Sequence, residues 1–182
     1  MAEGTKREQI LAAAQALILR QGLRATTMEA IAAEAQVAKP TLYKYFGDKR
    51  EVFEAIVTGL AVRLHADFSD ALDGNGGIID RLAEALTVKY REIDRVLAGS
   101  PHADELYGEQ ERSMAPQLRR ADAATADRVV EELTAAGVKD AGRLTELLLA
   151  AAFGVGRKAA SPAEIGPAMR VLVERLVGPE FK

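Results

Sequence analysis

The chain has 182 residues, of which 48% are hydrophobic and 28% are charged, so it can form a packed core and is not disordered as a whole. It contains no cysteine, which excludes a disulfide scaffold, a thiolate zinc site and a cysteine nucleophile. Two histidines are too few for a multi-histidine metal centre. The net charge is −3, so any surface that binds nucleic acid must be local.

The N-terminus resembles a secretory signal peptide in one respect, because Lys6 and Arg7 precede the apolar residues 10–19. Gln15 interrupts that run, however, and an amphipathic helix explains the pattern better. The longest apolar run, residues 147–156, is about half as long as a membrane span requires. We therefore expect a soluble, cytoplasmic protein.

Helical signals recur along the chain, whereas alternating β-branched runs do not occur. Thr5, Thr26 and Asp48 are each followed three residues later by glutamate, a spacing typical of helix N-termini. Pro167 predicts that the last helix begins with a separate turn and becomes regular only near Ala168. We expect an all-α fold of about nine helices, at residues 6–21, 27–35, 39–46, 49–72, 78–98, 101–111, 114–136, 141–159 and 161–177.

The segment 26–49 carries the clearest functional signal. Two short predicted helices are joined by a tight turn, which is the layout of a helix-turn-helix whose second helix enters the DNA major groove. The net charge is +1 over residues 1–60 and −4 over residues 61–182, and residues 36–50 carry four cations, Lys39, Lys44, Lys49 and Arg50, against Asp48 alone, which is a small basic patch on an acidic chain. Leu42 and Phe46 are spaced to pack inward. The donors left toward the outside are Lys39, Thr41, Tyr43, Lys44 and Tyr45.

From spacing alone, an ordinary helical hairpin with exposed polar residues remains the alternative. The segment also resembles the DNA-binding domain of the TetR-type transcriptional regulators, over roughly residues 6–60. The similarity is carried by Thr26-Thr27, Ile31-Ala32, Ala35, Val37, Thr41-Leu42-Tyr43, Tyr45-Phe46, Lys49 and Val52-Phe53. The resemblance implies a DNA-binding domain at residues 1–50 and an effector-binding and dimerisation domain at 51–182, bridged by the fourth helix.

The resemblance also implies roles for single residues in DNA binding. Thr27 would contact a phosphate, with Thr26 as the helix cap, and Lys49 would anchor another phosphate. Tyr43 and Tyr45 would donate to phosphates. The side chains expected at base edges are Lys39, Pro40, Thr41 and Lys44.

Two residues depart from the family pattern. Gln36 stands where most relatives carry glycine, in the turn between the two short helices, so we expect a strained turn or a different geometry. Ala38 stands where relatives often carry serine, which removes a possible cap or phosphate donor. Both changes affect how the domain would dock on DNA.

The rest of the chain suggests a small-molecule site and a dimer. The resemblance implies an effector pocket for an apolar or amphipathic ligand, and the expected lining residues are Phe68, Tyr90, Leu97, His102, Leu106, Tyr107, Met114, Leu118 and Phe153. The last two helices carry broad apolar faces, of the kind that a two-fold partner covers in a four-helix bundle. The expected interface residues are Leu144, Leu148, Ala151, Ala152, Val155, Met169, Leu172, Val173 and Leu176.

Catalysis is the competing class of function. His65 and His102 lie in no catalytic motif, and the carboxylates are scattered over predicted helix surfaces, so we expect no enzyme, no cofactor and no metal. The sequence thus predicts a homodimeric regulator that represses from a palindromic operator and is released by a small ligand. Control by a partner protein is the first alternative, and a helical enzyme is the second.

Overall fold

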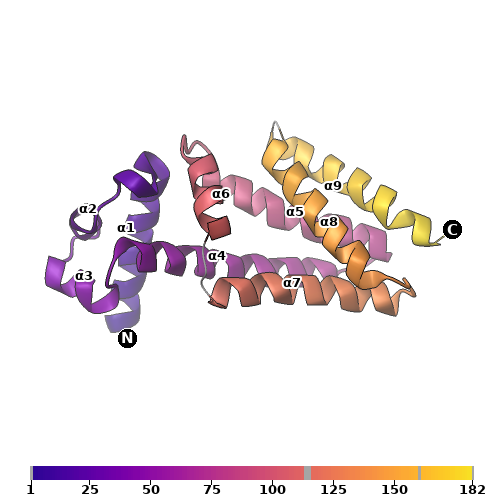
Figure 1. The fold of residues 1–182 in the computed structure, drawn as a ribbon, viewed down its shortest axis with the longest axis horizontal. Coiled ribbons are helices and arrows are strands. Elements are labelled where there is room, and N and C mark those ends of the chain that lie inside the picture. Colours follow the sequence, from indigo (N-terminus) through magenta and orange to yellow (C-terminus); the bar gives the residue numbers. More distant parts are fainter. Residues whose placement is uncertain (1, 113–115, 160, 182) are drawn as a thin grey trace. The chain divides into compact units, whose positions relative to one another are not determined.

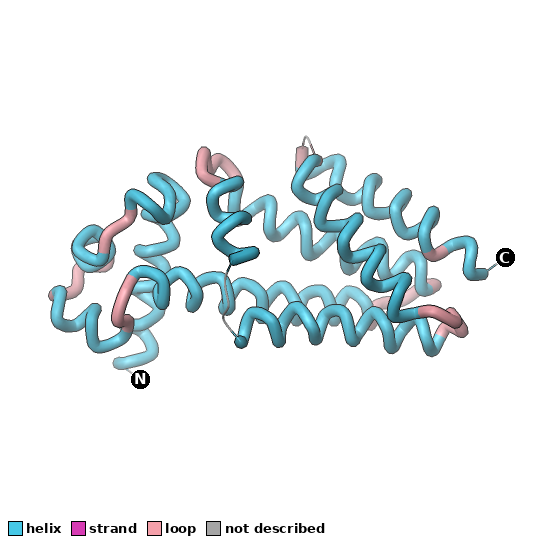
Figure 2. The backbone as a smooth tube through the Cα atoms, viewed as in Figure 1, coloured by secondary structure: helices cyan, strands magenta, loops and turns pink. Residues whose placement is uncertain are grey.

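The computed structural model describes residues 2–112, 116–159 and 161–181, and over these residues it contains nine α-helices and no strand (Figures 1 and 2). The predicted all-α class is therefore confirmed. The helices are α1 (Ala2–Ala25), α2 (Met28–Glu34), α3 (Lys39–Tyr45), α4 (Lys49–Leu72), α5 (Ile78–Leu97), α6 (Ala103–Arg112), α7 (Pro116–Ala135), α8 (Ala141–Lys158) and α9 (Pro162–Leu176), followed by a 3₁₀ turn at Gly178–Phe181.

The chain folds into two compact units. Unit 1 comprises Met1–Leu60 and Gly99–Leu118, and unit 2 comprises Ala61–Ala98 and Arg119–Lys182. Helix α4 is shared between these units, just as the fourth helix bridges the two domains expected from the sequence, but α6 belongs with the N-terminal helices and not with the second expected domain. The chain therefore passes between the units three times.

Unit 1 is built on an aliphatic core beneath α1, α2, α3 and the start of α4. Ile10 and Ala14 of α1 are fully buried, as are Ile31 of α2, Leu42 of α3 and Val52 of α4. These side chains recur at helical spacing, so each helix presents one apolar stripe to the same core. Since α2 and α3 have seven residues each, this burial rather than helix propensity keeps them folded.

The end of α1 contains a break at Gly22. Its φ of 83° and ψ of 160° are not helical, and a further short turn reaches Ala25. The predicted end of the first helix at Gly22 is thus confirmed. A Cβ atom at this position would lie 3.0 Å from Nδ1 of His102 and 2.5 Å from Oε2 of Glu105, so a larger residue would displace these α6 side chains in addition to straining the backbone.

Unit 2 is a bundle in which α5 packs against α8 and α9. Fully buried residues of α5, α8 and α9 form its centre, among them Leu86, Leu148 and Val173. Gly156 of α8 lies directly against the ring of Tyr90, where a larger residue would collide with the ring. Only a backbone without a side chain can approach the aromatic ring in this way.

The prediction for α9 was wrong. The helix runs without interruption from Pro162, although Pro167 lies inside it. A proline at this position cannot donate to the carbonyl four residues earlier, which belongs to Ala163. Both Ala163 and Pro167 are exposed, so water can satisfy that carbonyl and the helix continues.

The turn after α2 has the left-handed conformation that the glycine of the relatives would favour. Gln36 has a φ of 52°, and it is the one non-glycine residue with positive φ in the described part of the chain. Its N–H donates to the carbonyl of Ala33, and the N–H of Val37 donates to the carbonyl of Ala32. This pair of bonds is a Schellman motif, which ends α2 and turns the chain toward α3.

Replacing Gln36 with glycine should therefore stabilise the protein by about 0.5–1 kcal/mol, because glycine adopts this conformation without strain. Urea denaturation at fixed protein concentration measures the change. Ala33→Gly is the matched control, since Ala33 is also exposed but lies within α2, and it should lose about 1 kcal/mol. A loss of stability in Gln36→Gly would contradict the account of this turn.

Candidate nucleic-acid interface

The start of α2 is capped by Thr27 and not by Thr26. Oγ1 of Thr27 accepts a hydrogen bond of 3.1 Å from the N–H of Ala30, and Thr27 is exposed. Thr26 is fully buried, and its hydroxyl donates to the carbonyl of Gly22 at 2.7 Å. The expected cap at Thr26 is thus wrong by one residue. Thr26 ties the end of α1 to the start of α2 and has no side-chain surface for DNA.

Helix α3 has a buried side and an exposed side, as the spacing predicted. Leu42 is fully buried and Phe46 is 4% exposed, and both belong to the core of unit 1. On the other side Tyr43 is 44% exposed and Lys44 is exposed. An exposed phenol next to an exposed ammonium offers hydrogen-bond donors for phosphates and base edges.

The remaining predicted contacts of α3 lie around that exposed side. Pro40 is exposed in the first turn, where its fixed φ suits a helix start and its missing N–H costs nothing. Thr41 is half-buried. Tyr45 is also half-buried and packs against the core of unit 1, so its ring positions α3.

Lys39 is exposed and is held by two neighbours. Its Nζ lies 2.5 Å from Oε1 of Glu29 in α2 and 5.9 Å from the centre of the Tyr43 ring. The ion pair with Glu29 raises the pKa of Lys39 and lowers the pKa of Glu29, so both groups stay charged near neutral pH. Both side chains are mostly exposed, and an exposed ion pair of this kind is weak, so Lys39 can exchange Glu29 for another partner.

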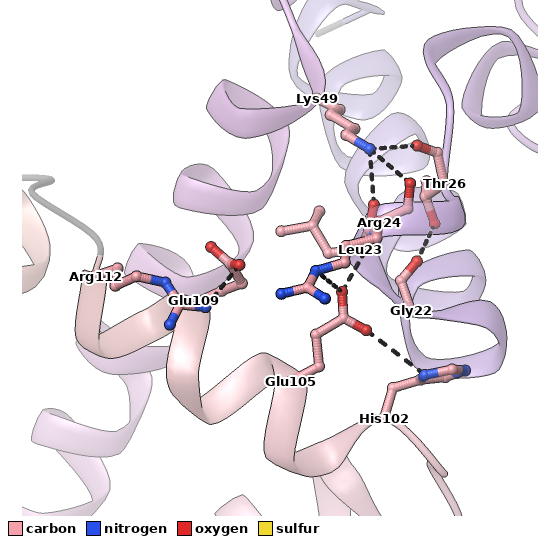
Figure 3. A network of polar contacts seen from close by, with 9 residues as sticks. All are labelled: Gly22, Leu23, Arg24, Thr26, Lys49, His102, Glu105, Glu109 and Arg112. Carbon is pink, nitrogen blue, oxygen red and sulfur yellow. Dashed lines mark hydrogen bonds and ion pairs between the residues drawn. The ribbon is translucent and has the colours of Figure 1, made fainter.

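Lys49 has a role that the sequence did not reveal. Its Nζ donates to the carbonyl oxygens of Leu23, Arg24 and Thr26, each at 3.0 Å (Figure 3). An ammonium group has three donors, and all three are directed at the end of α1. The expected phosphate contact of Lys49 is therefore replaced by a structural one, in which a cation caps the helix C-terminus.

The start of α4 is fixed by a second capping arrangement, one that the spacing predicted. The N–H of Glu51 donates to Oδ1 of Asp48 at 2.9 Å, and Oε2 of Glu51 accepts from the N–H of Gly47 at 2.7 Å. Together with the Lys49 contacts, these bonds define where α3 ends and α4 begins.

Helix α6 adds a polar contact to the same region (Figure 3). Oε1 of Glu105 accepts a 3.0 Å hydrogen bond from the N–H of Arg24, while Oε2 lies 3.6 Å from Nδ1 of His102. Ser100, just before α6, donates to the carbonyl of Leu19 at 2.7 Å. Sequence reasoning missed Glu105, because a glutamate on a helix surface has no signal that distinguishes it from other glutamates.

The residues predicted to line an effector pocket fall into both units. In unit 2, Phe68 and Tyr90 are buried in the core, and Leu97 and Phe153 are half-buried. In unit 1, Leu106 is buried, and His102 and Tyr107 are half-buried. Met114 and the side chain of Leu118 lie outside the described residues.

The residues predicted for a dimer interface separate into two groups. Four have no exposed surface in the single chain and belong to the core of unit 2, namely Leu148, Ala152, Met169 and Val173. These four cannot offer surface to a partner. The partly exposed ones are Leu144, Ala151, Val155, Leu172 and Leu176. Leu147 of α8 and Val171 of α9 are 46% and 56% exposed.

Over the described residues, no group of three or more histidines or carboxylates is arranged to hold a metal ion. No helix in this part of the chain is long and apolar enough to cross a membrane.

Comparisons with known proteins point to one family. Residues 10–56 match the family model described as "Bacterial regulatory proteins, tetR family". Over 90 residues the chain is 29% identical to the HTH-type transcriptional repressor KstR2 of Mycobacterium tuberculosis. The matched residues make up 50% of this chain and 45% of that protein. The chain is 32% identical over 123 residues to the uncharacterised HTH-type transcriptional regulator YdeS of Bacillus subtilis. That match covers 66% of this chain and 62% of YdeS.

By sequence similarity, the chain thus spans about half the length of KstR2 and somewhat less than two thirds of the length of YdeS. Solved structures extend the similarity of fold to nearly the whole chain. A TetR/AcrR-family regulator from Thermobifida fusca has a TM-score of 0.75 at 23% identity, over 93% of this chain and 96% of that one. The structure of KstR2, described as a ketosteroid transcriptional regulator, has a TM-score of 0.64 at 20% identity, over 95% and 93%.

The structural role of Lys49 makes a prediction that separates it from Lys44. Lys49→Met should destabilise the protein by about 1–2 kcal/mol, because three carbonyls lose a charged donor. Lys44→Met is the matched control, since it removes the same charge from an exposed site and should leave stability within about 0.5 kcal/mol. Urea denaturation measures both. Equal stabilities of the two variants would show that the hydrogen bonds of Lys49 do not stabilise the domain.

Proposed function

The chain belongs to the TetR family of bacterial regulatory proteins, and we propose that it represses transcription by binding operator DNA through α3. The observation that carries the proposal is the two-sided character of this helix. Leu42 and Phe46 anchor it in the core of unit 1, while Tyr43 and Lys44 are exposed beside each other. A short helix that is rigidly held and rich in donors suits the major groove.

The exposed side chains divide into two kinds of contact. Lys39, Pro40, Thr41 and Lys44 would face base edges, where hydrogen-bond donors and apolar groups can distinguish sequences. Tyr43, Tyr45 and the start of α2 at Thr27 would contact phosphates, which hold the domain in register. Thr26 and Lys49 act indirectly, by fixing the ends of the helices that carry these contacts.

Operator binding in this proposal requires a homodimer. Two recognition helices reach successive major grooves only when they lie about 34–36 Å apart, which is one turn of DNA. Exposed or partly exposed apolar side chains on α8 and α9, including Leu147, Ala151 and Val171, would form the two-fold interface. Such an interface repeats the same surface on both copies, so the operator would be a palindrome.

A small apolar or amphipathic ligand would release the DNA. Unit 2 has a large aliphatic and aromatic core, and the similar protein KstR2 is described as a ketosteroid regulator, which is consistent with an apolar effector. Helix α6 belongs to unit 1, whereas the chain on both sides of it belongs to unit 2. A ligand that shifts α5 or α7 would therefore pull on α6, whose Glu105 holds the backbone of Arg24.

Selection of bound duplexes from a random DNA pool tests the proposal. A regulator of this kind should enrich one palindromic sequence, and a titration of that duplex should show specific affinity well above that for scrambled DNA. No enrichment at low salt would reject DNA binding. Thermal-shift screening of the bound complex then separates the two modes of control, because a compound set without any hit would favour a partner protein.

Lys44 should contribute to sequence-specific DNA binding, whereas Tyr43 should contribute equally to the binding of all sequences. Lys44→Ala should weaken binding to the selected duplex by about 1–3 kcal/mol and change the preferred base at one position. Tyr43→Phe, which removes one hydroxyl, should weaken selected and scrambled duplexes alike. Binding titrations on both duplexes measure the effects. If Lys44→Ala weakened binding to both duplexes equally, the Lys44 side chain would not contact base edges.

Leu147 should be needed for dimerisation. Leu147→Glu places a charge on an apolar surface that a partner would desolvate, so the dimer should dissociate and operator binding should be lost. Val62→Glu is the matched control, because Val62 is 55% exposed on α4 and should leave the dimer intact. Sedimentation analysis measures the association. A dimeric Leu147→Glu variant would place the interface elsewhere.

A further inference from the structure

Helix α5 carries a charged residue, Lys89, on its buried side. The buried positions Leu82, Ala85 and Leu86 recur at helical spacing, and the same stripe continues through Lys89 to Ile93, which packs against the core of unit 2. Lys89 is half-buried at a position where the pattern calls for an apolar residue. An ammonium group at such a position needs either an anion or water.

Within the described residues, no carboxylate lies within 4.0 Å of the Lys89 ammonium, and this ammonium makes no hydrogen bond. Asp122 of α7 attracts the Lys89 ammonium, but this attraction does not offset the burial of Lys89. Burial accordingly lowers the pKa of Lys89 and raises the pKa of Asp122. The cation is therefore only partly compensated within the protein.

The helix that carries Asp122 also makes a polar contact with α4 inside unit 2. One turn after Asp122 on α7, Thr125 is 3% exposed and its hydroxyl donates to the carbonyl of Ala121 at 3.1 Å. Since that hydroxyl has a single proton, Nδ1 of His65 on α4 must be the donor in the 3.2 Å bond between His65 and Thr125. Nε2 of His65 remains available as an acceptor when the ring is neutral.

A second unsatisfied group lies on the same helix as His65. Oγ of Ser69, one turn later on α4, is buried and has no hydrogen-bond partner in the described residues. Buried hydroxyls in folded proteins are almost always hydrogen-bonded, so an orphan of this kind marks a place where a partner is missing. Phe68, which precedes Ser69, and Leu86 and Tyr90, which flank Lys89 on α5, all belong to the core of unit 2.

We propose that Lys89 binds the carboxylate of an amphipathic acid whose apolar body lies against the core of unit 2. The inference rests on the proposed control by a ligand and names the chemical class of that ligand. Lys89 retains an open side, because it is only half-buried, and an anion can reach it from there.

A neutral ligand would not explain the same features. It would bury Lys89 further without supplying an opposite charge, which is unfavourable in an apolar environment. An acid removes that penalty, since charge-assisted hydrogen bonds are stronger than those between neutral groups. Asp122 competes for the same cation, so its removal should help an acidic ligand.

The test compares two acids with different apolar bodies, decanoate and cholate, with their neutral amides, decanamide and cholamide. Thermal unfolding and operator release are measured for the wild-type protein, Lys89→Met, Asp122→Asn and Lys139→Met. Lys139 is exposed between α7 and α8, so Lys139→Met makes the same charge change away from the site. At least one acid should stabilise the wild-type protein by several degrees more than its amide.

That preference for the acid should disappear in Lys89→Met, persist in Lys139→Met and increase in Asp122→Asn. Without ligand, Lys89→Met should unfold at the same or a higher temperature than wild type, which shows that the variant is folded. Equal shifts with acid and amide, no shift with either acid, or an unchanged preference in Lys89→Met would overturn the inference. If amides bind and release the operator, ligand control survives while the role of Lys89 fails.

Discussion

The ammonium group of Lys49 binds two carbonyls at the end of α1 and the carbonyl of Thr26 just after it, and thereby holds the start of α4 against the end of the first helix. The carbonyls at the end of a helix have no partner within it, and here one cation supplies three donors at once. Thr26 adds a bond to Gly22 from the other side. With both ends fixed, α2 and α3 have only a short path between α1 and α4.

This constraint explains how seven-residue helices can present a recognition surface. Neither α2 nor α3 is long enough to be stable alone. Their positions depend on the buried residues beneath them, and on the left-handed turn at Gln36 that sets the angle between them. Helix α6 contacts the same frame through Glu105, at the backbone of the residues that Lys49 caps. A movement of α6 would therefore act on the backbone of Arg24, which Lys49 also binds.

The sequence predicted the features that depend on local chemistry. Helical spacing placed Leu42 and Phe46 inside and Tyr43 and Lys44 outside, and the break at Gly22 followed from its freedom of conformation. The departure at Gln36 correctly marked a strained turn.

Features that depend on contacts between distant residues were not predictable from the sequence. Nothing in the segment around Lys49 indicates that its donors reach the end of α1, and Thr26 and Thr27 are equivalent as caps until their burial is known. In the same way, helical periodicity could not distinguish the core residues Leu148 and Met169 from surface residues such as Leu147, because apolar residues occupy several sides of α8 and α9.

The central claim is that α3 and the start of α2 form the DNA-binding surface on a frame held by Lys49. Hydrogen–deuterium exchange of the full-length chain, with and without a selected operator duplex, tests it most directly. The account predicts slower exchange with DNA in peptides covering residues 27–45. Protection elsewhere in the chain, with residues 27–45 unchanged, would contradict it.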